Sequence, residues 1–356
     1  MRRSSAPTLQ DVARDAGVTA MAASVVLNGA RSSARVSEQT RARILAAAAR
    51  LGYRPNAVAR GLFRRRMDTV GVVANVDGVD VNFYFLEVLN GILEEASERD
   101  QNVFVFSVKR WEDADPNILR HCDGRVDGLI LVGPVITADF AEALHNRTPF
   151  VTIHSNAPLP GTTDIQVDDA AGAYAAVQRL VALGHRRIAH LAASPDLIGA
   201  ARRIEGYRRA LEEAGIAYDP ELVLHGGFTV ESGRRSTQAL IERGNVPTGV
   251  FCVNDAVAFG CMEALSAAGL RVPEDVSVIG FDNTPTAMMT NPPLTTLRQP
   301  LRQMGRRAVE ALLPLIDEAV SVPDAEVVTA PVVVPGVELF PVDLIVRASI
   351  GPAPAV

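Results

Sequence analysis

The chain has 356 residues, 48% of them apolar and 21% charged, which indicates a globular protein and excludes a disordered tail, a collagen-like repeat or a disulfide-stapled miniprotein. Its three scattered cysteines and the lack of a secretory or membrane-spanning apolar run predict a cytoplasmic protein that does not contact a membrane. The net charge of −6 divides into +10 on residues 1–66 and −16 on the remainder, a pattern typical of a nucleic-acid-binding module attached to an acidic body.

Three short helices are predicted in the first fifty residues. The first follows the N-cap Thr8 and ends at Gly17, and the second follows Thr19 and stops at the Asn-Gly pair 28–29. Ser37 caps a third, longer helix. Its predicted apolar face consists of Ile44, Leu45, Ala48 and Leu51. Two short helices around a glycine turn, backed by a third, predict a helix-turn-helix unit, and the basic charge favours one that binds DNA.

The strings TLQDVARDAGVTAMAASVVLNG and RVSEQTRARILAAAARLGYRPNAVARGL closely resemble the DNA-binding head of the lactose-repressor (LacI/GalR) family of bacterial transcription regulators. The resemblance extends over residues 8–62 apart from the loop between the two strings. It implies that the partner is double-stranded operator DNA. It also implies a division into a head at 1–53, a hinge helix and linker at 54–67, and a core at 68–349.

The resemblance further implies which residues contact DNA. They are Thr8, Thr19, Ala20, Met21, Ala22, Val25, Asn28, Tyr53, Asn56, Ala59, Arg60 and Leu62. In the second helix, which reads the major groove in the family, Met21 and Val25 stand where polar residues are usual, so readout must use thymine methyl groups, groove shape or a substitute. Arg31 and Arg35, in a loop longer than the family pattern, are candidate substitutes; the alternative is a solvated loop tip.

Residues 54–66, RPNAVARGLFRRR, predict a hinge helix that begins after Asn56 and is too short to be stable alone. In the family this helix folds on DNA together with its dimer mate. The resemblance places at Leu62 the leucine that wedges into the minor groove. Arg60 and the arginines at 64–66 are expected to neutralise phosphates. The alternative is that Leu62 and Phe63 pack on the core as linker residues.

From Met67 onward, buried strands alternate with amphipathic helices in two successive sets, which predicts two similar lobes with parallel sheets covered on both faces. The strings LGHRRIAHLA, GVFCVND, RVPEDVSVIGFDN and PPLTTLRQPLRQMGRRAVE also resemble the effector-binding core of the family. We therefore expect a small all-α helix-turn-helix head on an α/β two-lobed, periplasmic-binding-protein-like core. The lobes are predicted at 68–166 with 295–327 and at 167–293 with 328–349.

The resemblance implies a site for a small-molecule effector between the lobes. Its predicted lining residues are Asn75, Asp77, Tyr84, His154, Arg203, Phe228, Asn254 and Asp282. The donors of Arg203, the acceptors of Asp282 and a flat aromatic ring suit a sugar or another hydroxylated molecule. Asp255 is either a ligand contact or a helix cap, and His154 is either a ligand contact or a buried histidine. Trp111 faces either the site or solvent.

No nucleotide-binding, zinc-protease or nucleophile-elbow motif occurs, and the six histidines do not cluster at metal-ligand spacing. We therefore expect neither an enzyme nor a cofactor. The predicted function is that of a homodimeric, sequence-specific transcriptional regulator, a repressor, whose affinity for operator DNA changes when the effector binds. Two alternatives remain open: a regulator that binds DNA without a ligand, and one that responds to a non-sugar metabolite such as a purine.

Overall fold

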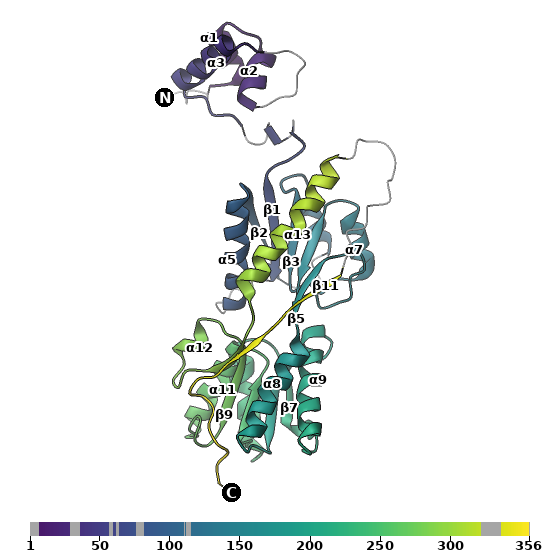
Figure 1. Cartoon of the computed structure of the whole chain (residues 1–356), viewed down its shortest axis with the longest axis vertical. Coiled ribbons are helices and arrows are strands. Elements are labelled where there is room, and N and C mark those ends of the chain that lie inside the picture. The colour runs from purple at the N-terminus through teal and green to yellow at the C-terminus, as the bar shows by residue number, and fades with distance from the viewer. Residues whose placement is uncertain are drawn as a thin grey trace.

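The computed structural model describes residues 7–28, 36–56, 60–61, 64–75, 82–109, 111, 115–321 and 336–355. Five residues with a predicted role lie outside the described residues: Arg31, Arg35, Ala59, Leu62 and Asp77. The described parts form a small helical head, a first lobe and a second lobe, which follow one another along the long axis of the molecule (Figure 1).

The head consists of three helices whose ends follow from local capping. They are α1 (Leu9–Ala16), α2 (Ala20–Asn28) and α3 (Glu38–Leu51). Thr8 forms a capping box with Asp11 at the start of α1, and Gly17 ends that helix in the left-handed conformation, with φ 62°. Ser37 accepts a hydrogen bond from the amide of Thr40 and so caps α3.

A single small core holds the three helices of the head together. Ile44 of α3 is fully buried beside Val12 of α1 and Ala23 of α2. The predicted apolar face of α3 was wrong in part, because Leu45 is 50% and Leu51 is 36% exposed. Adjacent residues on a helix point about 100° apart, so Ile44 shares its face with Ala47, which is buried, and not with Leu45.

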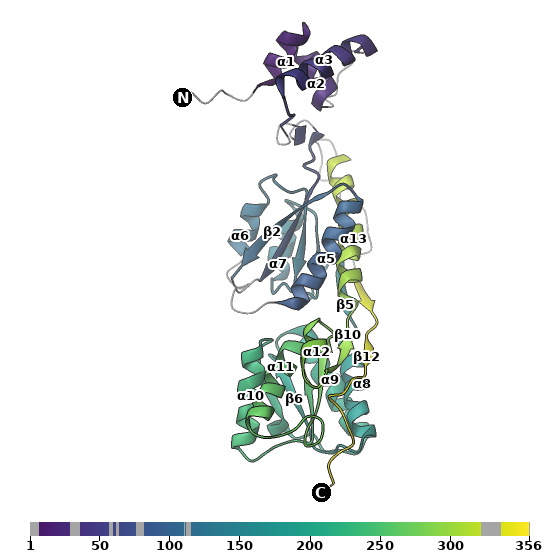
Figure 2. The same cartoon turned by 90° about the vertical axis from the view of Figure 1, so that its left-hand side faces the viewer.

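The first lobe is a six-stranded, wholly parallel sheet with helices on both faces. The strand order is β11 (Val337–Phe340), β5 (Asp164–Val167), β4 (Phe150–Ile153), β3 (Gly128–Val132), β1 (Thr69–Asn75) and β2 (Asn102–Val108). One face is covered by α5 (Phe83–Glu98) and α13 (Leu301–Ser321), the other by α6 (Asp115–His121) and α7 (Ala138–His145) (Figure 2). Alternate residues of β3 serve the two cores, Ile130 toward α13 and Leu131 toward α7.

The second lobe repeats this plan with a second six-stranded sheet. The order is β12 (Asp343–Ile345), β10 (Thr295–Arg298), β9 (Ser277–Asp282), β8 (Gly249–Cys252), β6 (Ile188–Ala193) and β7 (Val223–Gly226). Only β12 runs antiparallel to its neighbour. The faces are covered by α8 (Asp169–Ala182) and α9 (Ile198–Glu213), and by α10 (Val230–Glu242) and α11 (Asp255–Ala267), while α12 (Thr286–Met289) follows β9. The prediction of a helical head and two lobes with parallel sheets is confirmed.

The chain passes between the lobes three times, and two of the crossing points differ from the prediction. The segment 295–298 was assigned to the first lobe, but it is β10 and pairs with β9 of the second. The segment 337–340 was assigned to the second lobe, but it is β11 and pairs with β5 of the first. Both strands are only four residues long, and β10 lies between Pro293 and Pro300, so the sequence pattern there resembles a linker.

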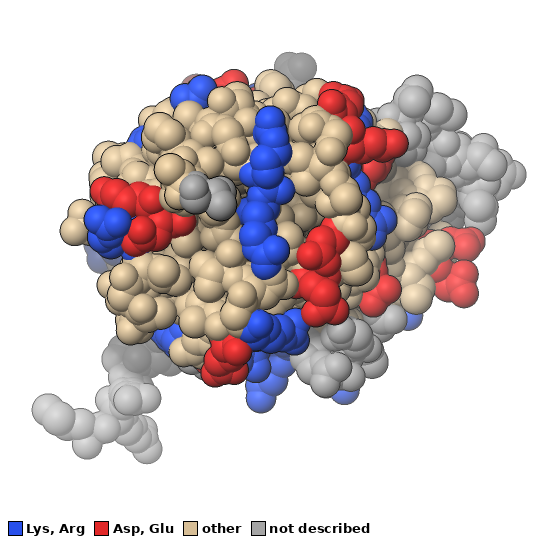
Figure 3. All heavy atoms as spheres, turned by 90° about the horizontal axis from the view of Figure 1, so that it is seen from below, with Lys and Arg blue, Asp and Glu red and all other residues tan. Residues whose placement is uncertain are grey.

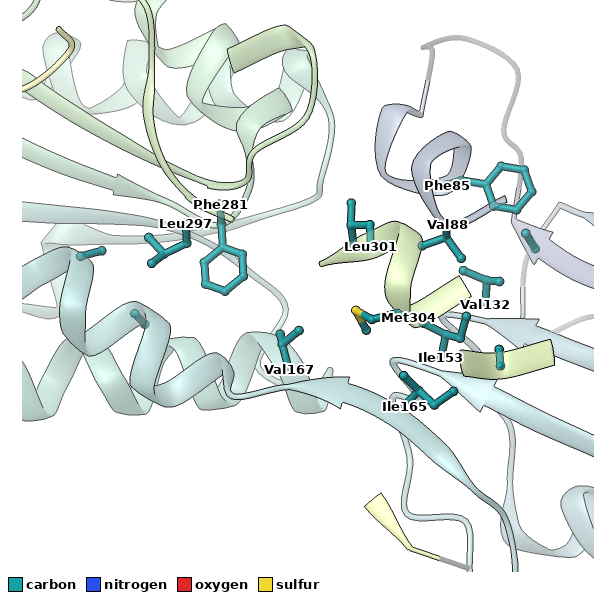
Figure 4. Packing of buried hydrophobic residues seen from close by; sticks show 14 of the residues in the cluster. Phe85, Val88, Val132, Ile153, Ile165, Val167, Phe281, Leu297, Leu301 and Met304 are labelled. Carbon is teal, nitrogen blue, oxygen red and sulfur yellow. The ribbon is translucent and has the colours of Figure 1, made fainter. Parts of the chain in front are cut away.

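The two lobes share a continuous apolar core at the crossings. Phe281 and Leu297 of the second sheet belong to the same buried cluster as Val167, Leu301 and Met304 (Figure 4). These residues lie immediately beside the crossing segments, so the lobes are joined by packed side chains as well as by the backbone.

The end of the second lobe farthest from the head carries charges of both signs. Acidic and basic side chains are interspersed there, with a line of basic side chains across the middle (Figure 3). In the described part of the chain, no helix combines the length and apolar character that crossing a membrane requires.

Candidate functional sites

The outward face of α2 is apolar. Met21 is 58% exposed, Ala20 is also exposed, and Val25 is partly buried. The hydroxyl oxygen of Thr19 accepts a hydrogen bond from the amide of Ala22 at 3.2 Å and so caps the helix. The second helix of a helix-turn-helix unit lies in the major groove, so α2 would present methyl and thioether groups to the base edges.

Three predicted DNA contacts are engaged within the head. Asn28 is only 4% exposed, and its Nδ2 donates to the Ser24 hydroxyl at 3.2 Å. It faces inward because positions 24 and 28 lie one turn apart on the same helix face. The hydroxyl of Thr8 donates to Asp11, and Tyr53 packs partly buried against the head core. Of these, Asn28 lies in the interior of the head, and its contact with DNA stays a prediction.

The hinge is tied to the first lobe by hydrogen bonds and ion pairs. Asn56 is exposed, and its carbonyl accepts a helical hydrogen bond from the amide of Arg60 at 3.0 Å. Arg66 pairs with Asp68 at 3.3 Å and with Asp317 near the end of α13. The carboxylate of Asp127, just before β3, accepts from the amides of Met67 and Thr69 at 2.7 and 3.2 Å. Arg66 was predicted to neutralise a phosphate, but here its charge is neutralised by Asp68 and Asp317.

Tyr84 and His154 lie together at the edge of the first lobe that faces the second. The Tyr84 hydroxyl and His154 Nδ1 are 2.5 Å apart. His154 directly follows β4 and has a φ of 52°, an uncommon backbone conformation for a non-glycine residue. Asn75 ends β1, and its side chain donates to the carbonyl of Lys109. Trp111 is 6% exposed within the first-lobe core, so neither of its two predicted positions applies.

Arg203 is the centre of a buried group in the second lobe. Its Nε lies 2.8 Å from the carboxylate of Asp169, and both side chains are almost fully buried. Its guanidinium also donates to the carbonyl of Val253 and lies 3.7 Å from the ring centre of Phe281. Asp169 was not among the predicted site residues; the neighbouring Asp168 caps α8 and leaves Asp169 for the ion pair.

Asp282 ends β9 and is 5% exposed. Its carboxylate accepts a hydrogen bond from Gln299 at 2.6 Å, and its φ of 111° is an unusual backbone conformation. Burial and the nearby charge of Asp255 raise the pKa of Asp282 to about 8, against the opposing effect of Arg203. Gln299 is a second residue of the site that was not predicted from the sequence.

Asn254, Asp255 and Phe228 have separate roles. Asn254 is the N-cap of α11 and donates to the carbonyl of Phe228 at 3.0 Å. Asp255 is 1% exposed and accepts from the amide and hydroxyl of Thr284 and from Thr296, which ties α11 to the sheet. The helix-cap role left open for Asp255 is wrong, because the cap is Asn254. Phe228 is 44% exposed.

Groups from the two lobes are close enough to affect one another electrostatically. Burial raises the pKa of the Tyr84 phenol, and the charges of Asp282 and Arg203 in the opposite lobe act on it with opposite signs. Burial lowers the pKa of His154, and Asp169 opposes this. Tyr84, His154, Arg203 and Asp282 are thus gathered at the lobe junction, together with Asp169 and Gln299.

The raised pKa values make the stability of the core pH-dependent. An unfolded carboxyl titrates near pH 4, whereas the folded pKa is about 7 for Asp255, mainly through burial, and about 8 for Asp282. Below about pH 6.5, histidines whose pKa burial lowers, such as His190, act with the opposite sign, because the unfolded chain binds more protons there. Above that pH the two carboxyls hold more protons in the folded state, so the free energy of unfolding should fall as the pH rises from about 6.5 to about 8. Denaturant titrations across this range should show the fall, and Asp282→Asn should flatten it.

The control is Asp123→Asn, because the exposed carboxyl of Asp123 has its pKa lowered by a hydrogen bond from Arg125. It should leave the slope above pH 5 unchanged. An unfolding free energy that is flat from pH 6.5 to 8 in the unaltered protein would contradict the protonation of these two carboxyls.

Comparisons with known proteins agree with this architecture. Residues 8–56 match the model of bacterial regulatory proteins of the lacI family, and residues 177–349 match the periplasmic binding protein-like domain. The chain is 34% identical to catabolite control protein A of Priestia megaterium, over 86% of this chain and 91% of that protein. The chain belongs to the LacI family of bacterial regulatory proteins. Its predicted fold class, including the periplasmic-binding-protein-like core, is confirmed.

Other LacI-family members are similar over nearly the whole chain. The HTH-type transcriptional repressor PurR of Vibrio atlanticus is 34% identical over 87% of this chain and 92% of its own length. The structure of the Lac repressor dimer bound to operator and the anti-inducer ONPF has a TM-score of 0.81 at 30% identity, covering 97% of this chain and 99% of that one. A complex of the regulator CelR with cellobiose has a TM-score of 0.70 at 30% identity, covering 96% and 99%. This LacI-family protein is therefore a DNA-binding transcriptional regulator.

Proposed function

We propose that this LacI-family regulator is a homodimeric repressor whose operator affinity changes when a neutral, hydroxylated small molecule, a sugar, binds between the two lobes. The observation that carries the proposal is the gathering of Tyr84 and His154 from one lobe with Arg203 and Asp282 from the other. We propose no catalytic activity for this protein, because its relatives are transcriptional regulators. The site of action is the cytoplasmic chromosome, where the operator lies.

The chemistry of the junction favours a hydroxylated ligand over an anion. The charge of Arg203 is balanced by Asp169, and its guanidinium also bonds to a backbone carbonyl. Asp282 has acceptor capacity beyond its bond from Gln299, and Tyr84 adds a hydroxyl. Hydroxyl groups can both donate to such acceptors and accept from such donors, whereas an added anion would find the buried guanidinium of Arg203 already paired with Asp169. The CelR complex with cellobiose is a relative with a sugar ligand.

The proposed dimer interface includes an apolar surface on the first lobe. Leu86 and Leu93 lie two turns apart on α5 and are 40% and 44% exposed. Phe104 and Val105 on the edge strand β2 are 45% and 46% exposed. Large apolar side chains exposed on neighbouring elements are typical of surfaces that a partner covers. A second copy of the chain as that partner would place two heads on the two halves of one operator.

Effector binding can change operator affinity only through a difference in affinity for two arrangements of the core, typically about 1–3 kcal/mol. Titration calorimetry with neutral mono- and disaccharides and with purine bases should find a sugar that binds. Operator DNA should change the affinity for this sugar by a certain factor, and the sugar should change the affinity for operator by the same factor. Binding of a purine base alone would favour the alternative regulator, and no difference between the two titrations would contradict the coupling.

The second part of the test removes the head. The head core shares no residue with the clusters of the lobes, so a chain lacking residues 1–60 should keep its fold and its sugar binding. It should lose all specific operator binding, because the basic head is absent. Retention of full duplex affinity by this chain would contradict the assignment of DNA binding to the head.

A further inference from the structure

We propose that Met21, supported by Val25, reads the C5-methyl groups of thymines in the operator, so that this regulator recognises its half-sites by apolar contact. The inference rests on the proposed function, because it requires that the head binds operator DNA with α2 in the major groove. It differs from readout by paired hydrogen bonds, which needs amide, carboxylate or guanidinium side chains on the reading helix.

The described part of α2 offers no such side chain on its outer face. Its two polar residues, Ser24 and Asn28, are 5% and 4% exposed and bond to each other on the inner side. The hydroxyl oxygen of Thr19 is used as the helix cap. The largest exposed side chain of the helix is that of Met21, a flexible and polarisable thioether that adapts well to an apolar surface.

The arginines of α1 and α3 are engaged elsewhere. Arg14 pairs with Asp11 at 3.1 Å, and Arg50 pairs with Asp15. Arg43 donates to the carbonyl of Ala16 at the end of α1. The fourth, Arg41, is 3.9 Å from Glu38. These side chains support the head and its positive potential, and they leave the outer face of α2 as the surface that meets the bases.

Only one base in DNA presents an apolar group in the major groove. Thymine carries a C5-methyl, and apolar side chains contact it, whereas adenine, guanine and cytosine present donors and acceptors there. A donor or acceptor of such a base that faced Met21 would lose its water without gaining a hydrogen-bond partner, so these bases are disfavoured at that position. The apolar face of α2 is therefore matched to T·A pairs, and the methyl group is the feature that it reads.

The experiment starts from the tightest duplex selected by the full-length protein from a random library. Each thymine is then replaced in turn by deoxyuridine, which removes the methyl group and keeps the base pairing. At one or two thymines in each half-site, the loss should weaken binding about fourfold, the factor that corresponds to about 0.8 kcal/mol for one buried methylene. Replacing the same T·A pairs by 5-methylcytosine·guanine should weaken binding less than replacing them by cytosine·guanine.

Protein variants assign the effect to the residue. Met21→Ala should bind the thymine and deoxyuridine duplexes equally, and circular dichroism should be unchanged because alanine is a good helix former. The matched control is Leu45→Ala on α3, which removes a comparably exposed apolar side chain and should keep the fourfold difference. The double variant Arg31→Ala/Arg35→Ala should weaken all duplexes alike and keep the same difference.

The outcomes separate this inference from the function on which it rests. A tight duplex in which no deoxyuridine changes affinity would overturn methyl readout and leave DNA binding intact. A difference that persists in Met21→Ala, or that disappears in the double arginine variant, would assign the reading to another group and overturn the role of Met21. Failure of the full-length protein to enrich any duplex would overturn the proposed function together with this inference.

Discussion

Replacing Asp169 by asparagine should lower the free energy of unfolding by about 3–5 kcal/mol, the usual cost of leaving one member of a buried ion pair uncompensated. The cost arises at Arg203, because its guanidinium is buried and lies 2.8 Å from the carboxylate that the substitution removes. Its remaining contacts, with a carbonyl and the Phe281 ring, cannot supply a negative charge. Chemical denaturation followed by far-ultraviolet circular dichroism measures the change.

Two further variants test the reason for this loss. Asp343→Asn removes the partner of Arg298 from an exposed ion pair and should cost less than about 1 kcal/mol. The double variant Asp169→Leu/Arg203→Met removes both buried charges and should recover most of the stability while abolishing sugar binding. Equal losses in Asp169→Asn and Asp343→Asn would show that burial of the pair does not matter.

Substitution of Gly91 by alanine should destabilise the first lobe by about 3 kcal/mol, at the upper end of the range for overpacking. The added Cβ would lie 2.0 Å from the carbonyl oxygen of Arg302 on α13. A side chain could rotate away, but a backbone oxygen moves only if the whole helix moves. Gly305 makes the reciprocal approach to the carbonyl oxygen of Val88, so α5 and α13 touch along their backbones.

The control for this prediction is Gly227→Ala, where the added Cβ meets no atom within 4 Å. Its unfolding free energy should change by less than about 0.5 kcal/mol. Gly91→Ala should also weaken dimerisation in sedimentation experiments, because separating α5 from α13 displaces the exposed Leu86 and Leu93. Unchanged stability in Gly91→Ala would mean that the two helices are not in backbone contact.

Features encoded over short stretches of sequence were predicted correctly. The N-caps Thr8 and Ser37 act through atoms three residues away, so the sequence places them. The buried strands of both lobes form continuous apolar runs, which the pattern of a two-faced parallel sheet requires. The strand β10 has only four residues, too few to show an alternation of apolar and polar side chains. Its place in the second sheet is decided by its pairing with β9.

The candidate site was only partly predictable, because it depends on contacts between distant positions. The partners Asp169 and Arg203 are 34 residues apart, and Asp282 and Gln299 are 17 apart. No local pattern distinguishes Asp169 from the capping residue before it. The inward position of Asn28 was open to prediction, since Ser24 lies one helical turn earlier and could have been considered as its partner.

The length of α13 has a consequence for how the molecule moves. The helix begins at the lobe junction, where Leu301 and Met304 are packed, and near its other end Asp317 holds Arg66 of the hinge. Twenty-one residues at about 1.5 Å each make a lever arm of roughly 30 Å. A tilt of α13 by about 5° about its packed end would displace its far end by nearly 3 Å. A displacement of that size is enough to break a hydrogen bond or an ion pair.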